Sequence, residues 1–122
     1  MKLNDLALAA ACLVTVSAFA AEPTLMKKDG VLVDPAGMTV YTFDQDTANS
    51  GKSACVDGCI TNWPAVKASE GELAAPYSAI TRPDGTRQLA YKGKPLYTFV
   101  KDKKAGDKTG DKAKNVWHAV TE

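Results

Sequence analysis

The residues with the richest chemistry in this 122-residue chain are cysteines, a histidine and aspartates. Cys55 and Cys59 are separated by three residues, and His118 is the only histidine. Two thiolates and one imidazole could bind Cu(I), because soft ligands favour that ion. If the cysteines are oxidised to a disulfide, they leave no thiolate for a metal. We therefore expect a disulfide and no resident cofactor, with a copper-binding or redox accessory protein as the alternative.

Catalysis by a nucleophile requires a base and an orienting partner, and the chain has one histidine and no Gly-x-Ser-x-Gly. A hydrolase that uses two carboxylates is the third alternative, and its stereochemistry would depend on their separation. The candidates are Asp44, Asp46, Asp102, Asp107 and Asp111. Asp46 and Asp102 follow two similar strands, so we expect each to accept backbone N–H bonds in its loop. The chain is thus expected to be non-catalytic.

An internal repeat must position these residues. An offset of 56 residues superposes residues 37–46 on residues 93–102 with five identities in ten positions, where about one is expected by chance. After a two-residue change in loop length, residues 63–66 match residues 117–120. Each half reads Gly, Tyr-Thr-Phe-x-x-Asp, a polar loop, and Trp-x-Ala-Val. The repeated structural positions are Gly37, Tyr41, Phe43, Asp46 and Trp63, and then Gly93, Tyr97, Phe99, Asp102 and Trp117.

The local patterns predict an all-β fold of two tandem pseudo-symmetric repeats, each a β-hairpin plus a Trp-containing strand. The hairpins are expected over residues 30–43 and 86–99, with a further strand over residues 77–81. Alternation along a strand places both aromatic residues of Tyr-Thr-Phe on one face, which we expect to be core. The connecting loops are pinned by the disulfide or rich in Lys, Asp and Gly. Helical turns are expected only within residues 48–58 and 68–75.

The first 20 residues are typical of a signal peptide, with Lys2, an apolar run over residues 6–19, and Ala18-Phe19-Ala20 as the cleavage signal. We therefore expect a periplasmic or secreted protein. Acylation at Cys12 is less favoured because it would shorten the apolar run and leave residues 13–16 on the mature terminus. Residues 21–29 are expected to be an N-terminal tail. Residues 30–122 are expected to be one domain, with repeats over about 30–66 and 86–121.

Composition limits the partners. A net charge of +1 gives no electrostatic case for nucleic acid, and no segment after the leader is apolar enough to span a membrane. Residues 92–114 hold eight lysines and three aspartates, a local net charge of +5. This stretch could dock an acidic partner or remain a solvated loop. The sequence thus indicates a binding or interaction module for an unknown envelope protein or small ligand, in an oligomeric state that the sequence leaves open.

The two Tyr-Thr-Phe-x-x-Asp motifs, Cys-x-x-x-Cys followed by Trp-Pro, and Gly-Lys-Pro-Leu-Tyr-Thr-Phe before Trp-His resemble a bacterial secreted-repeat family. That family is described as predicted lipoproteins with a Tyr-x-aromatic-x-x-Asp motif. The likeness covers about residues 30–121. It implies an exported chain with tandem copies of one unit, and it implies no reaction.

Overall fold

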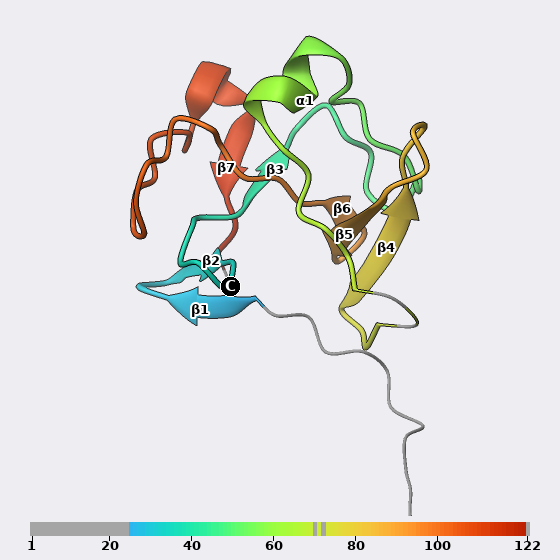
Figure 1. The fold of residues 1–122 in the computed structure, drawn as a ribbon, viewed down its shortest axis with the longest axis horizontal. Coiled ribbons are helices and arrows are strands. Elements are labelled where there is room, and N and C mark those ends of the chain that lie inside the picture. Colours follow the sequence, from blue (N-terminus) through green and yellow to red (C-terminus); the bar gives the residue numbers. More distant parts are fainter. Residues whose placement is uncertain (1–24, 70, 72, 122) are drawn as a thin grey trace, which may run out of the picture.

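The computed structural model describes residues 25–69, 71 and 73–121. The predicted leader and Cys12 lie outside these residues. Within the described part the fold is all-β, with short strands and little helix (Figure 1). The strands are β1 (Met26–Lys28), β2 (Val31–Val33), β3 (Tyr41–Phe43), β4 (Tyr77–Thr81), β5 (Arg87–Tyr91), β6 (Lys94–Pro95) and β7 (Trp117–Ala119). The helical elements are α1 (Gly58–Asn62) and the 3-10 turn η1 (Ala113–Asn115).

Each half of the chain begins with an antiparallel hairpin. In the first half β1 pairs with β2, and in the second half β4 pairs with β5, which also pairs with β6. The first hairpin turns at Asp29-Gly30, where both residues have positive φ, as such tight turns require. The tail predicted for residues 21–29 therefore ends earlier than expected, because Met26–Lys28 forms β1.

The third sheet joins the two halves. Strand β3 from the first half pairs with β7 from the second, with Phe43 opposite Trp117 and Tyr41 opposite Ala119. In the first half, residues 63–66 correspond to β7. This segment forms no continuous strand, and an isolated bridge joins its Ala65 to Tyr97 of the second half. Each half therefore donates its Trp-containing segment to the other half.

The backbone hydrogen bonds confirm this exchange and show that it is reciprocal. Val120 donates its N–H to the Val40 carbonyl and accepts the Leu32 N–H, at 2.9 Å in both cases. Val66 likewise donates to the Leu96 carbonyl at 3.0 Å and accepts the Leu89 N–H at 2.8 Å. Because buried backbone groups must be paired, each half depends on the other to complete its ladder.

The exchange explains why the predicted long hairpin strands are interrupted. Val33 bridges Thr39, but beyond Val40 the chain turns away from the first hairpin to pair with β7. The strand expected over residues 94–99 is likewise reduced to β6, and Tyr97 bridges the other half. Helix α1 begins where the first predicted helical turn was expected to end.

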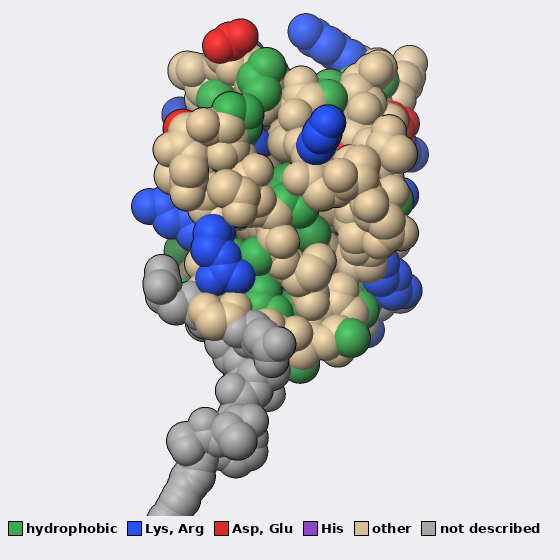
Figure 2. All heavy atoms as spheres, turned by 90° about the vertical axis from the view of Figure 1, so that its right-hand side faces the viewer, with side chains coloured by type: hydrophobic (Ala, Val, Ile, Leu, Met, Phe, Trp, Pro, Cys, Tyr) green, Lys and Arg blue, Asp and Glu red, His purple; other side chains and the backbone are tan. Residues whose placement is uncertain are grey.

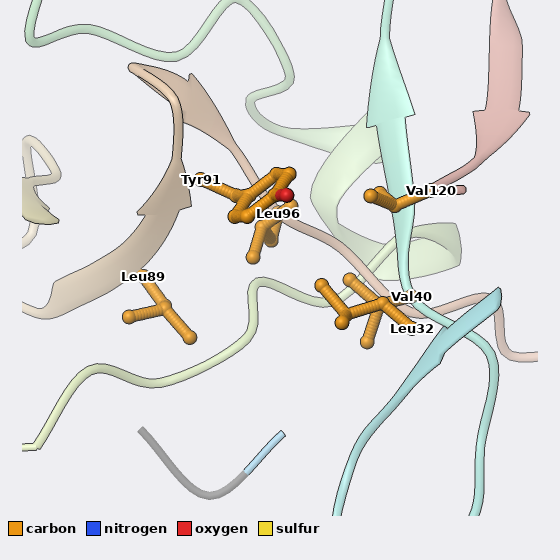
Figure 3. Packing of buried hydrophobic residues seen from close by; sticks show 6 residues of the cluster. All are labelled: Leu32, Val40, Leu89, Tyr91, Leu96 and Val120. Carbon is orange, nitrogen blue, oxygen red and sulfur yellow. The ribbon is translucent and has the colours of Figure 1, made fainter. Parts of the chain in front are cut away.

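A hydrophobic cluster fills the space between the two hairpins. It contains side chains from both halves, which point toward one another in Figure 3. The buried members are Leu32, Val40, Leu89, Tyr91, Leu96 and Val120. Each fully buried aliphatic side chain of this kind contributes roughly 1.5–3 kcal/mol. The exchanged strands therefore also supply the core.

The predicted disulfide is present. Cys55 and Cys59 are bonded, with their Cα atoms 5.1 Å apart, and the Cys55 side chain is fully buried. The bond holds the start of α1 against the loop that precedes it. No helix in the described part of the chain meets the length and apolarity that crossing a bilayer demands.

Replacing both cysteines with serine should lower the free energy of unfolding by about 2 kcal/mol, because the closed loop is short and its entropy is small. Urea unfolding of the variant and the wild type would measure this difference. Circular dichroism should show that the folded spectrum is kept. An unchanged unfolding midpoint, or loss of the folded state, would contradict this account of the bond.

Candidate functional site

Four aromatic rings form one continuous stack across the junction of the halves, in the order Phe43, Trp117, Trp63 and Phe99. The two indoles lie 3.7 Å apart between centroids and are almost parallel, at 2°. Phe43 stacks on Trp117 at 4.2 Å, and Phe99 stacks on Trp63 at 3.9 Å. Each phenylalanine thus covers the tryptophan that belongs to the other half.

The two motif tyrosines meet this stack at right angles. The Tyr41 ring lies 5.4 Å from Trp63 at 85°, and the Tyr97 ring lies 5.2 Å from Trp117 at 89°. Edge-to-face geometry is favoured because the ring edge is electropositive and the face electronegative. Tyr41 and Tyr97 also exchange their backbone N–H and carbonyl groups, at 2.7 and 2.9 Å. Because these two backbone bonds join the tyrosines directly, they fix the positions of both tyrosine rings against the stack.

Each tyrosine hydroxyl donates a hydrogen bond to the motif aspartate of the opposite half. Tyr41 donates to Asp102 at 2.7 Å, and Tyr97 donates to Asp46 at 2.6 Å. The other carboxylate oxygen accepts a loop N–H, from Thr109 at 2.9 Å for Asp102 and from Ala54 at 2.6 Å for Asp46. The loop N–H bonds follow the sequence prediction. The tyrosine bonds were missed, because spacing within a motif does not show a partner 51 or 61 residues away.

Burial determines the electrostatics of these groups. It raises the pKa of Tyr41 and of Tyr97 well above the usual value, and the hydrogen bond to the aspartate raises each pKa further. Burial also raises the pKa of Asp46, while the Ala54 N–H, the Tyr97 hydroxyl and the Arg82 charge lower it. Below the alkaline range, both tyrosines are therefore neutral donors.

A buried cation supports the Asp46 side of this network. Arg82 donates to the Gln88 amide oxygen at 2.8 Å and to the Cys55 carbonyl at 2.6 Å. Gln88 is fully buried and donates in turn to the Leu96 carbonyl at 2.8 Å. These bonds connect β5 to the disulfide loop, and no pattern in the sequence indicates them.

A pocket of about 540 Å³ opens along the aromatic stack. Its walls include α1 and η1, which lie at the same end of the molecule in Figure 1. The lining residues are Phe43, Gln45, Gly58, Cys59, Asn62, Trp63, Phe99, Lys101, Ala113, Lys114, Val116 and Trp117. Two other pockets are smaller, about 280 and 260 Å³. The stack is therefore a wall of a ligand-sized cavity as well as part of the core.

The aromatic residues of the two motifs do not share one environment. Tyr41 and Tyr97 are fully buried, as expected for core residues. Phe43 and Phe99 are only half-buried and line the pocket, so the prediction that both are core residues is corrected. Alternation places the phenylalanines on the same strand face as the tyrosines. That face is buried at the tyrosines, but at the phenylalanines it borders the pocket.

The repeated glycines give room to the loop of the other half. A Cβ at Gly37 would lie 2.8 Å from the Ala105 Cβ, and a Cβ at Gly93 would overlap Asn49. Both glycines have positive φ, at 85° and 81°. Asn49 donates its N–H to the Gly93 carbonyl at 2.9 Å, so the close approach is itself hydrogen-bonded.

The residues of the copper hypothesis do not form a cluster. Cys55 and Cys59 are bonded to each other, and His118 Nε2 lies 2.8 Å from the exposed Asp44 carboxylate. His118 is on β7 between Trp117 and Ala119, so its side chain points away from the stack. In the described residues, no three His, Cys, Asp or Glu side chains are arranged to hold a metal ion.

The candidate carboxylates are distributed over separate structural contacts. Asp46 and Asp102 bond different tyrosines, and Asp44 lies against His118. Asp107 accepts the N–H groups of Lys103 and Lys104. Asp111 accepts the Ala119 N–H at 2.9 Å. The hydrogen bonds give each of these carboxylates a role in a turn or between strands.

Comparison with known proteins gives one family. A sequence profile described as a secreted repeat of unknown function matches the chain twice, at residues 24–67 and 78–121. The first match includes β1 and the second begins within β4, so each copy begins with its hairpin. Neither the curated proteins nor the solved structures contain a significant match to this chain.

Tyr41→Phe and Tyr97→Phe should each lower the free energy of unfolding by about 1.5–3 kcal/mol, because each removes a hydrogen bond to a carboxylate. A double-mutant cycle should show coupling between Tyr41→Phe and Asp102→Asn. The matched control combines Tyr41→Phe with Asp46→Asn, whose effects should add to within about 0.5 kcal/mol. Coupling of Tyr41 to Asp46 instead would contradict the reciprocal pairing.

Stability should decline in alkaline solution because of the same tyrosines. Their pKa values are raised in the folded state, so the stabilisation is complete below the ordinary tyrosine pKa of about 10. Above it, the unfolded chain loses the protons while the folded chain keeps them, and stability decreases as pH rises. Tyrosinate absorbance should show Tyr41 and Tyr97 ionising together with the loss of circular dichroism. If every tyrosine ionises before unfolding begins, this prediction is wrong.

Proposed function

Since this chain belongs to the family of secreted repeats of unknown function, we propose that it is an exported, non-catalytic binding module that holds a small ligand in the pocket between its halves. The observation that supports this most directly is the position of the pocket. It opens at the junction where both halves contribute equivalent aromatic residues. Sites at such junctions are common, because two units create a concavity that neither has alone.

The lining of the pocket is typical of small-molecule sites. Four aromatic side chains are among its lining residues, together with the apolar Cys59, Ala113 and Val116, and a few polar side chains are placed among them. The rings are held in place before any ligand arrives, because both faces of each indole are already stacked. A pre-formed wall reduces the ordering cost of binding.

We place the protein in the periplasm or outside the cell, on the basis of the predicted leader. The disulfide supports this location, since such bonds persist in oxidising compartments. Cleavage after Ala20 remains the favoured processing, and acylation at Cys12 the less favoured one. A partner of the module, whether an envelope protein or a small molecule, would then meet it outside the cytoplasm.

Binding without catalysis is favoured over the two alternatives by the contacts of the candidate residues. A Cu(I) site would need both thiolates, and the sulfur atoms are bonded to each other. A hydrolase would need two carboxylates aimed at one substrate, and Asp46 and Asp102 are held by different tyrosines. We therefore propose a module with no resident cofactor.

A neutral aromatic probe, naphthylmethanol, should quench the tryptophan fluorescence of the wild-type protein. The chain has two tryptophans and both line the pocket, so the whole emission reports on it. Ala113→Phe should weaken this binding about tenfold or more, because the added ring fills space at the pocket wall.

The matched control is Ala36→Phe, which adds the same ring in an exposed turn and should leave the affinity unchanged. Thermal unfolding of both variants would verify that they fold. If Ala113→Phe folds and binds the probe as tightly as the wild type does, the pocket is not the binding site. If the wild type shows no saturable binding at all, the proposed function fails.

A further inference from the structure

We propose that the pocket selects a planar aromatic anion, such as an aromatic carboxylate, and that two lysines of the second half hold its negative group. This inference rests on the proposed function, since it names the ligand class of the same pocket. It depends on three features: the charge of the lining, the orientation of the stacked rings, and the difference between the two halves.

The lining carries positive charge only. Lys101 and Lys114 are the charged lining residues and come from two separate segments, and Gln45 and Asn62 are the lining residues with neutral amides. Of the described residues that line the pocket, none is acidic. Asp44, which follows Phe43, lies against His118, which points away from the stack. An anion would therefore find two cations and no opposing carboxylate on the wall.

The stack presents its electropositive edges to the pocket. Trp63 is covered on one face by Trp117 and on the other by Phe99, and Trp117 is covered by Trp63 and Phe43. With 7% and 3% of their surface exposed, the indoles can reach the pocket only by their edges. Ring edges attract the electron-rich face of another ring or a carboxylate oxygen. A planar aromatic ligand could therefore place its electron-rich face against these ring edges.

The two cations lie at positions where the halves differ. By the internal alignment Lys101 corresponds to Gln45, and Lys114 corresponds to Ile60, which packs against the aromatic cluster. The pocket is thus pseudo-symmetric in its rings and asymmetric in its charge. A ligand with an apolar ring and one anionic group matches that asymmetry, with the anion toward Lys101 and Lys114.

The backbone around Lys114 supports a specific placement of this side chain. Lys114 and its neighbour Asn115 both adopt left-handed conformations, with φ of 51° and 61°. The matching residues of α1 form a regular helical turn. A left-handed conformation is unfavourable for lysine and persists only where surrounding structure imposes it. Here the altered turn places Lys114 at the pocket wall.

Other lysines of the second half provide an internal control. Lys104 and Lys108 are exposed on the same lysine-rich segment and are not among the lining residues. On the face toward β4, Lys and Arg side chains are scattered singly (Figure 2). If anions bound only through overall positive charge, Lys104 and Lys108 would matter as much as Lys101 and Lys114.

The test compares three probes of similar size: naphthoate, naphthylmethanol and naphthylmethylammonium. Affinities are measured by tryptophan fluorescence and calorimetry with the full chain. In the wild type, naphthoate should bind about three- to tenfold more tightly than the alcohol, and the ammonium least tightly, because two exposed lysines each contribute modestly. The preference should decline as salt is added.

The double variant Lys101→Gln, Lys114→Gln should reduce naphthoate affinity to about that of the alcohol and leave the alcohol unaffected. The double variant Lys104→Gln, Lys108→Gln changes the net charge equally and should alter neither affinity. Equal binding of naphthoate and alcohol by the wild type would overturn the anion proposal while the pocket proposal stands. A loss of naphthoate binding in the Lys104 and Lys108 variant alone would overturn it in favour of the lysine-rich loop. If no probe binds, the proposed function itself fails.

Discussion

The structure depends on one constraint: neither half of the chain has all the strands that its own sheet requires. Each half ends with a Trp-containing segment that pairs with the other half, through Val120 on one side and Val66 on the other. Val120 bonds Val40 and Leu32, 80 and 88 residues away in the sequence, and Val66 bonds Leu96 and Leu89, 30 and 23 residues away. The loop-closure entropy of these pairings must be regained from contacts across the junction. The shared aliphatic core, the aromatic stack and the tyrosine bridge all provide such contacts. We therefore expect folding to be cooperative over both halves, with no stable single repeat.

Reciprocity also gives the Tyr-x-Phe-x-x-Asp motif a physical meaning. The tyrosine and the aspartate of one copy do not bond each other, because the tyrosine of each copy donates to the aspartate of the other copy. The phenylalanine of one copy covers the tryptophan of the other. The glycine before the motif admits the loop of the other copy. Every residue of the motif therefore acts across the junction, and a change in one copy alters the environment of the other. The motif describes the junction between two copies, and the pocket is a consequence of that junction.

The sequence predicted the repeat, the disulfide and the burial of Tyr41 and Tyr97, since these follow from local spacing and from alternation along a strand. It could not predict the exchange, because alternation shows which face a side chain occupies and not which strand lies beside it. Strand β1 was missed although Asp29-Gly30 is a strong hairpin signal, because the first predicted hairpin begins only at residue 30, after that turn. Phe43 and Phe99 were assigned to the core because the pattern places them with the tyrosines, and only the tertiary structure shows that this face opens into a pocket. Arg82 and Gln88 gave no sequence signal, because a buried polar pair is defined by its partners.

The differences between the halves indicate which parts of the pocket are free of the folding constraint. The motif residues that meet at the junction, the glycine, tyrosine, phenylalanine, aspartate and tryptophan, are the same in both copies. The helical walls are not the same. In the first half, Cys59 is bonded to Cys55 and α1 is a regular turn. In the second half, the equivalent position is Ala113, and the wall is a 3-10 turn with Lys114 in a left-handed conformation. One wall is covalently pinned and neutral, and the opposite wall is held by hydrogen bonds and is cationic. The shared aliphatic core and the tyrosine–aspartate bonds do not include these two walls, so the walls can differ between the halves while those contacts are kept. The proposed selection of an anion depends on the second wall.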